Sequence, residues 1–244
     1  MRGTTGILSN HIIRYKGRTI AFSLERKNVR NINLRVKSDS TVIVSANRAV
    51  DYKHVEQFVL AKAPWVIKNL ERFDKRQKVE SSFQFITGEI MVYLGRQYEL
   101  LVVRCEKNEE VFIDHDKLFI FVSDENDYNR KEKLINCWLR DEAFRLFKCS
   151  MERIYPLVAA QGIAKPSITV RSMKTRWGSC SVNRQKITLN SELVKTPEEC
   201  IDYVVLHELA HFRHRKHDKM FYSFISELMP DWKERRKVLK NCLI

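Results

Sequence analysis

Residues 196–211 have the sequence TPEECIDYVVLHELAH, and this stretch decides most about the fold of the 244-residue chain. Thr196 can cap a helix, Pro197 suits its first turn, and Glu199 can complete a capping box with Thr196. Apolar residues then recur at intervals of four, four and three, namely Ile201, Val205, Leu209 and Phe212. The pattern predicts a helix that begins at Thr196 and packs this apolar stripe against a core.

His207 and His211, with Glu208 between them, form an HExxH sequence on this predicted helix. Residues four apart lie on one helix face, so the two imidazoles can bind one ion. Catalytic zinc takes three protein ligands and keeps its fourth position for water. His217 lies beyond the expected helix end, where a chain reversal can return its ring to the metal. We therefore predict that His207, His211 and His217 bind Zn²⁺ and that Glu208 is the catalytic base.

Several alternatives for these residues stay open. The two helical histidines and Glu208 can be ordinary surface residues, because HExxH also arises by chance. His214 can support a metal ligand, interact with the C-terminal end of the helix, or be a plain surface residue. Cys180 as a fourth ligand would exclude water and make the zinc structural. Asp218 can cap the following helix or contact a ligand such as His217.

The first half of the sequence alternates between strand-like and helical segments. Alternating apolar residues predict strands at residues 19–24 and 32–36, and a run of β-branched residues predicts one at 41–44; we expect the three to form a small antiparallel sheet. Residues 51–72 have helical spacing, and Pro64 is expected to divide them into two helices. Five further strands, at residues 83–86, 90–94, 98–103, 111–113 and 118–122, have the spacing of a meander. No internal repeat is evident.

From about residue 126 to residue 160 the pattern is helical again. We expect five residues on its buried faces, namely Leu134, Trp138, Phe144, Phe147 and Ile154. After the HExxH segment, apolar spacing predicts a helix that Asp218 caps and Pro230 ends. Asp231 with Glu234 can then cap a final helix.

The composition is that of an ordinary globular protein, with 44% hydrophobic and 30% charged residues. The sequence lacks an apolar run of membrane-spanning length and the apolar core of a secretion signal, so we expect a cytoplasmic protein without a membrane partner. The six cysteines lack disulfide-like spacing and are expected to be reduced. The net charge of +14 favours binding to nucleic acid, or is simply a well-solvated basic surface.

Further segments carry a family resemblance. They are Arg171-Ser172-Met173-Lys174-Thr175-Arg176-Trp177-Gly178-Ser179-Cys180, then Ile187-Thr188-Leu189-Asn190, and His217 with Phe221. Together with HExxH they resemble the YgjP-like metallopeptidases, relatives of the SprT and WLM metalloproteases, over about residues 170–224. Two positions depart from the family pattern: Tyr222 stands where Trp is frequent, and Asp218 where Ser is commoner.

The resemblance implies a zincin-like lobe, made of a small sheet, the HExxH helix and a further helix after the third ligand. It also implies that residues 174–180 can pair with an extended peptide, so Lys174, Trp177 and Gly178 are candidates for the wall of a substrate cleft. Trp177 is more typical of packing than of catalysis, and Gly178 of a turn or close approach. Tyr203, Tyr222 and Lys174 stay open as candidates for stabilising the oxyanion.

We therefore predict an α+β protein in which residues 1–125 form a strand-rich N-terminal region with a helical insertion and residues 126–244 form a zincin-like catalytic lobe. The predicted function is a zinc-dependent metallopeptidase that hydrolyses peptides or proteins by Glu-assisted attack of a zinc-bound water, with proteins near nucleic acid among its candidate substrates. One alternative is a non-catalytic nucleic-acid-binding protein with a structural zinc. Another is a latent peptidase whose N-terminal region covers the cleft.

Overall fold

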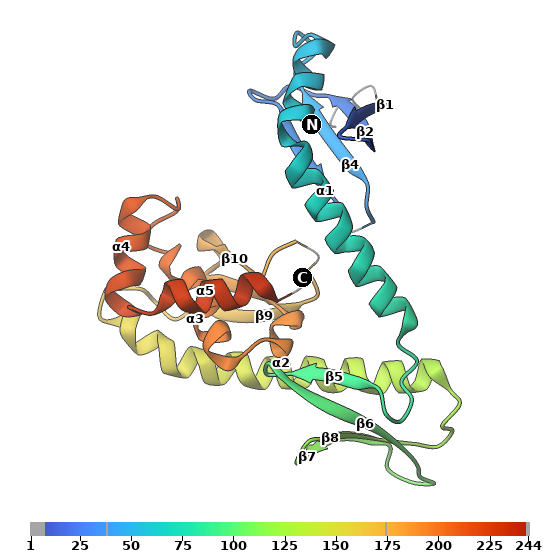
Figure 1. Cartoon of the computed structure of the whole chain (residues 1–244). Helices are drawn as coiled ribbons and strands as arrows, with labels where there is room; N and C mark the ends of the chain where they lie inside the picture. The colour runs from blue at the N-terminus through green and yellow to red at the C-terminus, as the bar shows by residue number, and fades with distance from the viewer. Residues whose placement is uncertain (1–7, 38, 174, 243–244) are drawn as a thin grey trace. The chain divides into compact units, whose positions relative to one another are not determined.

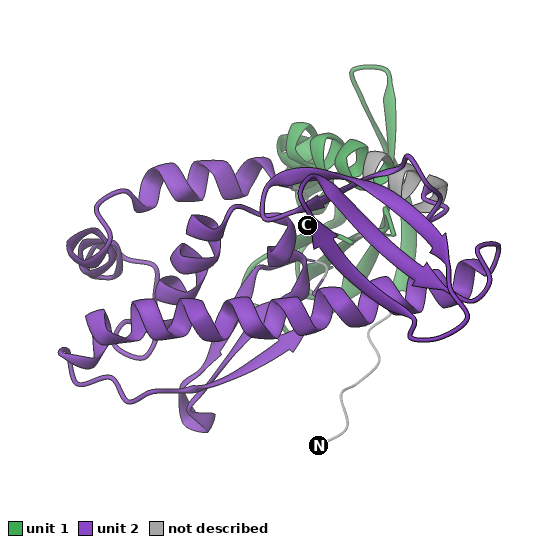
Figure 2. Cartoon of the chain, turned by 90° about the horizontal axis from the view of Figure 1, so that it is seen from below, with its two compact units in different colours: residues 1–82 green, residues 83–244 purple. Residues whose placement is uncertain are grey.

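The computed structural model describes residues 8–37, 39–173 and 175–242, which form three sheets and five α-helices (Figure 1). The chain divides into two compact units, Met1–Ser82 and Phe83–Ile244, each with its own hydrophobic core (Figure 2). No helix in the described part of the chain combines the length and the apolar character that a membrane span requires. The fold is therefore of the mixed α+β class, as the sequence predicts.

In the first unit a four-stranded sheet precedes one long helix. The strands are β1 (Leu8–Tyr15), β2 (Arg18–Arg26), β3 (Asn33–Val36) and β4 (Val42–Ala46), and the helix is α1 (Tyr52–Ser82). The sheet order is β1-β2-β4-β3, so β4 lies antiparallel to β3 but parallel to β2. The expectation of a wholly antiparallel sheet is wrong because β4 inserts between β2 and β3. β1 is a strand that the sequence pattern did not predict.

Pro64 lies inside α1 and does not divide it into two helices as expected. Its missing N–H and its ring cost about 3 kcal/mol in a helix interior. Val55, Val59 and Val66, on both sides of the proline, are completely buried in the same core. Each such side chain contributes about 1.5–3 kcal/mol when fully buried. The shared apolar face therefore outweighs the proline and keeps the helix continuous.

The second unit begins with another four-stranded sheet and another long helix. Its strands are β5 (Ile90–Tyr93), β6 (Arg96–Arg104), β7 (Glu110–Asp114) and β8 (Lys117–Val122), followed by α2 (Tyr128–Ala159). Their order is β5-β6-β8-β7 with β6 and β8 parallel, so they do not form the expected meander. Residues 83–86 form no strand. The helix confirms the expected helical region, although Phe144 is 56% exposed rather than buried.

The two four-stranded sheets have the same topology, a repeat that the sequence analysis missed. Each is a hairpin with the fourth strand inserted beside its second strand, and each precedes a helix of 31 or 32 residues. Both hairpins turn within a Tyr-x-Gly-Arg sequence, at residues 15–18 and 93–96. The central residues Lys16, Gly17, Leu94 and Gly95 all have positive φ, which suits the twist of a two-residue hairpin. This short sequence is the signal that could have revealed the repeat.

The remainder of the second unit carries a small sheet and three helices. The elements are β9 (Ser167–Arg171), β10 (Gly178–Ser181), η1 (Val182–Arg184), β11 (Lys186–Asn190), η2 (Ser191–Lys195), α3 (Glu198–Ala210), α4 (Lys219–Leu228) and α5 (Trp232–Asn241). The sheet order is β10-β11-β9, so β10 is an edge strand. An ion pair of Arg153 with Asp202, at 2.8 Å, joins α2 to α3.

The division between the units lies at 82/83, whereas the sequence analysis placed a boundary at 125/126. The reason is the hairpin tip between β5 and β6. The backbone N–H of Leu94 donates to the carbonyl of Val194 at 2.7 Å, and a Cβ on Gly95 would lie only 2.7 Å from Pro197 Cγ. Leu100 in this sheet also shares one core with Val205 of α3. The second sheet therefore belongs to the same unit as α3.

The predicted helix caps have mixed outcomes. The capping box at Thr196 is wrong, because the Thr196 hydroxyl donates to the Leu193 carbonyl and α3 begins at Glu198 without a side-chain cap. Capping by Asp218 is confirmed, since its carboxylate accepts from the Phe221 N–H at 3.1 Å. Asp231 occupies the cap position of α5, but its carboxylate binds Arg235 instead of the backbone.

Candidate metal centre

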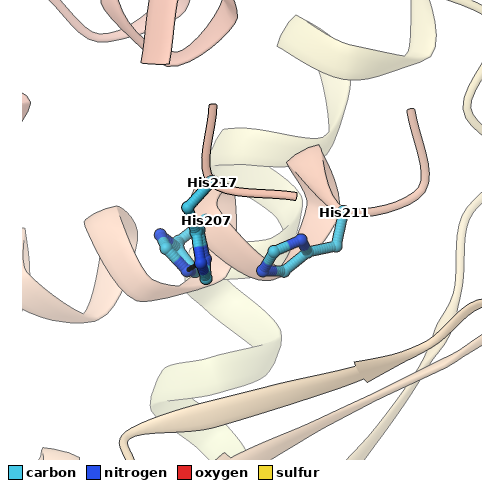
Figure 3. A group of neighbouring side chains, drawn as sticks. All are labelled: His207, His211 and His217. Carbon is cyan, nitrogen blue, oxygen red and sulfur yellow. Dashed lines mark hydrogen bonds between the residues drawn. The ribbon is translucent and has the colours of Figure 1, made fainter. Parts of the chain in front are cut away.

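The structure brings His207, His211 and His217 together (Figure 3). His207 lies on α3, His211 follows its last residue, and His217 lies in the connection to α4. Their potential ligand atoms all lie within 4.8 Å of one another, and the Nε2 atoms of His207 and His217 are 2.9 Å apart. The chain reversal predicted after the HExxH segment therefore exists and returns the third ring to the first two.

His211 is oriented by a second contact. Its Nδ1 lies 3.1 Å from the backbone carbonyl of His214, a geometry that places the ring proton on Nδ1 and leaves the Nε2 lone pair free. The His214 ring lies 5.5 Å from the Phe224 ring and is not among the three clustered rings. His214 thus supports His211 through its backbone.

Phe221 forms the apolar floor of the cluster. Its ring, which is fully buried, lies 4.8–5.0 Å from all three imidazole centroids. Burial, with smaller effects from the neighbouring histidines, lowers the pKa of His207 to about 3. Burial also lowers the pKa of His211. Both rings are neutral near pH 7, which is the form that binds a metal.

These residues fit a divalent transition metal. Two nitrogens bound tetrahedrally at about 2.0–2.1 Å lie about 3.3 Å apart, close to the 2.9 Å between the His207 and His217 nitrogens. The buried Nδ1 of His207 has no hydrogen-bond partner among the described residues. The arrangement thus supplies three imidazole nitrogen donors, and imidazole suits zinc among other transition metals.

Glu208 is buried beside the cluster, with 5% of its surface exposed. Burial raises the pKa of its carboxyl to about 8, and the nearby Arg176 opposes this shift. A Cβ at Gly178 would lie 2.6 Å from Glu208 Oε1, closer than real contacts allow. The backbone of β10 therefore approaches the carboxylate at a distance that only glycine permits, which agrees with the close approach expected for Gly178.

A cleft of about 630 Å³ opens over the cluster and Glu208. Trp177, Gly178 and Cys180 form one part of its wall, and Tyr203 another. Lys174, the remaining predicted wall residue, lies outside the described residues. Tyr222, an open candidate for oxyanion stabilisation, is not among the lining residues.

Cys180 does not join the histidine group among the described residues. Burial, assisted by the charge of Glu208, raises the pKa of its thiol to about 11, so it is protonated near neutral pH. The geometry therefore gives no support to a closed structural site with Cys180 as fourth ligand.

Asn190 holds the segment that carries this wall. Its buried amide donates to the carbonyls of Met173 and Arg176 at 2.7 and 2.9 Å, and accepts from the Met173 N–H at 3.1 Å. Its backbone N–H also donates to the Trp177 carbonyl at 2.8 Å. Asn190 belongs to the segments that carry the family resemblance, but its role could not be predicted, because its partners lie 13–17 residues away along the chain.

The family model for the YgjP-like metallopeptidase domain matches residues 30–242. The chain belongs to the YgjP-like family. It is therefore a metallopeptidase, and the alternative of a non-catalytic nucleic-acid-binding protein is not favoured. The relation to SprT and WLM proteins stays a prediction. No curated protein matches the sequence significantly.

Two solved structures resemble part of this YgjP-like chain. The metallopeptidase zymogen jannalysin of Methanocaldococcus jannaschii is 22% identical, with a TM-score of 0.32, over 37% of this chain and 94% of its own. The metallopeptidase zymogen abylysin of Pyrococcus abyssi is 21% identical, with a TM-score of 0.33, over 42% of this chain and 99% of its own. The assignment rests on the family match.

Proposed function

We propose that this metallopeptidase is a zinc-dependent enzyme of the zincin type, in which His207, His211 and His217 hold the metal and Glu208 is the general base. The observation that carries the proposal is the convergence of three imidazoles beside a buried glutamate in an open cleft. The pattern of three protein ligands with an open side is that of catalytic rather than structural zinc.

The roles of the protein groups follow from their positions. Zinc, when bound, supplies a Lewis acid that polarises the scissile carbonyl and acidifies water. Glu208 accepts a proton from the attacking water and delivers it to the leaving amide nitrogen. The free edge of β10 borders the same cleft, so an extended peptide can add to it as a further strand. Trp177 and Gly178 then lie in the substrate-binding wall.

Activity close to nucleic acid is a second, separate part of the proposal. It is supported by the net charge of +14. Binding of this kind releases counterions and weakens steeply with salt. Titration of the purified protein with a duplex and a single-stranded oligonucleotide at two salt concentrations tests it, and absent or salt-insensitive binding would reject it.

The experiment for the catalytic site combines metal analysis with one conservative substitution. Wild type, His207→Ala/His211→Ala and Glu208→Gln are purified without a histidine tag, and their metal content is measured by mass spectrometry. We expect near one zinc per chain in wild type and in Glu208→Gln, and loss of the metal in the double variant. Glu208→Gln should lower peptide turnover by about 10²–10⁴-fold.

Glu199→Gln is the matched control, because Glu199 lies on the same helix but is exposed and outside the cleft. It should retain both metal and turnover. Full turnover in Glu208→Gln, or a folded wild type that binds no zinc on titration, would reject the proposal.

A further inference from the structure

The cleft that contains the three histidines is bordered by positive charge. Arg176 precedes β10, Arg215 lies between α3 and α4, and Arg236 and Lys240 lie on α5. Within the described part of the chain, Glu208 is the only carboxylate among the lining residues. Three separate segments therefore bring cations to the same opening.

No described carboxylate forms an ion pair with any of these four cations, although basic residues nearby are paired. Arg153 on α2 binds Asp202 at 2.8 Å. The contrast is clearest on α5, where Arg235 binds Asp231 at 2.8 Å while the next residue, Arg236, faces the cleft. The charges at the cleft therefore remain available to a ligand.

Arg236 is held in a defined orientation. Its guanidinium lies 5.7 Å from the ring centroid of Tyr222 and 5.8 Å from that of Trp232, and these two rings stack at 5.1 Å. A guanidinium packed on aromatic faces keeps its N–H edge free to bind a carboxylate. Lys240 follows four residues later and so lies on the same face of α5. The helix thus presents two cations together.

We propose that the cleft selects acidic peptide segments, whose Asp or Glu side chains bind Arg236 and Lys240 on α5, and Arg176 and Arg215 on the other two segments. The inference rests on the proposed peptidase function and names its substrate class. A peptide is favoured over a nucleic acid because the same cleft contains Glu208 and the edge of β10, which serve amide hydrolysis and backbone pairing.

The test begins with the zinc-loaded full chain and a defined peptide mixture, whose cleavage sites are read by mass spectrometry against Glu208→Gln. Two quenched fluorescent peptides are then built around one cleaved site, identical except that Asp and Glu in one are Asn and Gln in the other. We expect kcat/KM for the acidic peptide to be about tenfold or more higher than that for the neutral peptide. This ratio should fall at high salt.

Lys240→Gln and Arg236→Gln should each lower the ratio of kcat/KM for the acidic peptide to that for the neutral peptide by about two- to fivefold. Lys237→Gln is the matched control, because Lys237 is exposed on the same helix but does not line the cleft. It should leave the preference unchanged. Because Lys240 is also exposed, its substitution remains informative even if loss of the stacked Arg236 disturbs folding.

The outcomes separate this inference from the peptidase proposal. Glu208-dependent cleavage with equal kcat/KM for both peptides would overturn the acidic preference and leave the peptidase intact. Absence of any Glu208-dependent cleavage would overturn both, because no peptide is then a substrate. If a single-stranded oligonucleotide binds Glu208→Gln more tightly than the acidic peptide does, and Arg236→Gln/Lys240→Gln loses that binding, the cleft is a nucleic-acid site and the inference fails.

Discussion

At Gly178 the absence of a side chain lets the backbone of β10 lie against Glu208, the proposed general base. The backbone of β10 lies against the Glu208 carboxylate where any Cβ would overlap it. The flexible end of the glutamate would have to move, and in the proposed mechanism this carboxylate exchanges a proton with the water and the amide nitrogen. The position of the Glu208 carboxylate therefore depends on the backbone of β10 in the cleft wall.

We expect Gly178→Ala to lower kcat by about 100-fold while the protein still folds and binds metal, because a displacement of about 1 Å is enough for such a loss. Peptide turnover and metal content measured on the same preparations check this. Ser181→Ala on the same strand is the control, since Ser181 does not line the cleft. Wild-type kcat in Gly178→Ala would show that the carboxylate has room to adapt.

The spacing of residues along the sequence predicted the cluster of three histidines, but not the basic residues at the edge of the cleft. The fixed periodicity of a helix places His207 and His211 on one face, and a short connection limits where His217 can be. Arg215, Arg236 and Lys240 carry no such signal, because their position depends on how α5 and the connection before α4 pack in three dimensions. The role of Asn190 was hidden for the same reason.

At the scale of elements, a partly exposed ion pair contributes to the link between the second sheet and α2. Glu109 pairs with Arg130 of α2 and accepts hydrogen bonds from the N–H and hydroxyl of Ser123 at 2.9 and 2.7 Å. The hydrogen bond from Arg130, followed by those from Ser123, lowers the pKa of Glu109 from 4.5 to about 2. A carboxylate with a lowered pKa stabilises the folded state only while it is ionised.

We therefore expect Glu109→Gln to lower the Tm at pH 7, and the difference from wild type to shrink as the pH falls below 4.5 toward 2. The sign follows because the unfolded state takes up the proton first as the pH falls. Thermal unfolding followed by circular dichroism from pH 7 to pH 3 measures the effect. Glu106→Gln, an exposed neighbour, controls for the change of charge. A Tm difference independent of pH would contradict the assigned interaction.

The sequence predicted the kind of each element better than its ends and its partners. Most strands and the helical regions were expected near their observed positions, because they depend on local periodicity. Strand pairing was wrong in both four-stranded sheets, since the insertion of β4 and β8 has no local signature. Pro64 shows the same limit, because tertiary burial decided against the local rule.

At the scale of the whole molecule, the chain contains two copies of one sheet-and-helix topology. Within the described residues, the histidine cluster lies in the unit of the second copy, on elements that pack against the helix of that copy. The sequence favours a boundary after the second sheet, because strand-rich and helix-rich stretches change there. The structure groups that sheet with the site through Leu94, Gly95 and a common core.

The separate cores predict separable stabilities. We expect Val59→Ala, in the core of the first unit, to cost about 1–3 kcal/mol and to lower one unfolding transition while metal content stays unchanged. Ile201→Ala, in the core beneath the site, should cost about 2–5 kcal/mol and lower the other transition. Differential scanning calorimetry with metal analysis distinguishes them. A single transition displaced equally by both variants would show that the units unfold together.

The closeness of the three histidines in the sequence has a consequence for the order of assembly. The three histidines lie within residues 207–217, and bringing together the ends of so short a segment costs little chain entropy. The wall at Gly178 and its bracing by Asn190 depend instead on contacts between distant parts of the chain. If the three histidines hold the metal as proposed, they can bind it before the sheet has formed. An ion bound to this segment would then serve as a template for the chain reversal after α3, and the docking of β10 would complete the cleft.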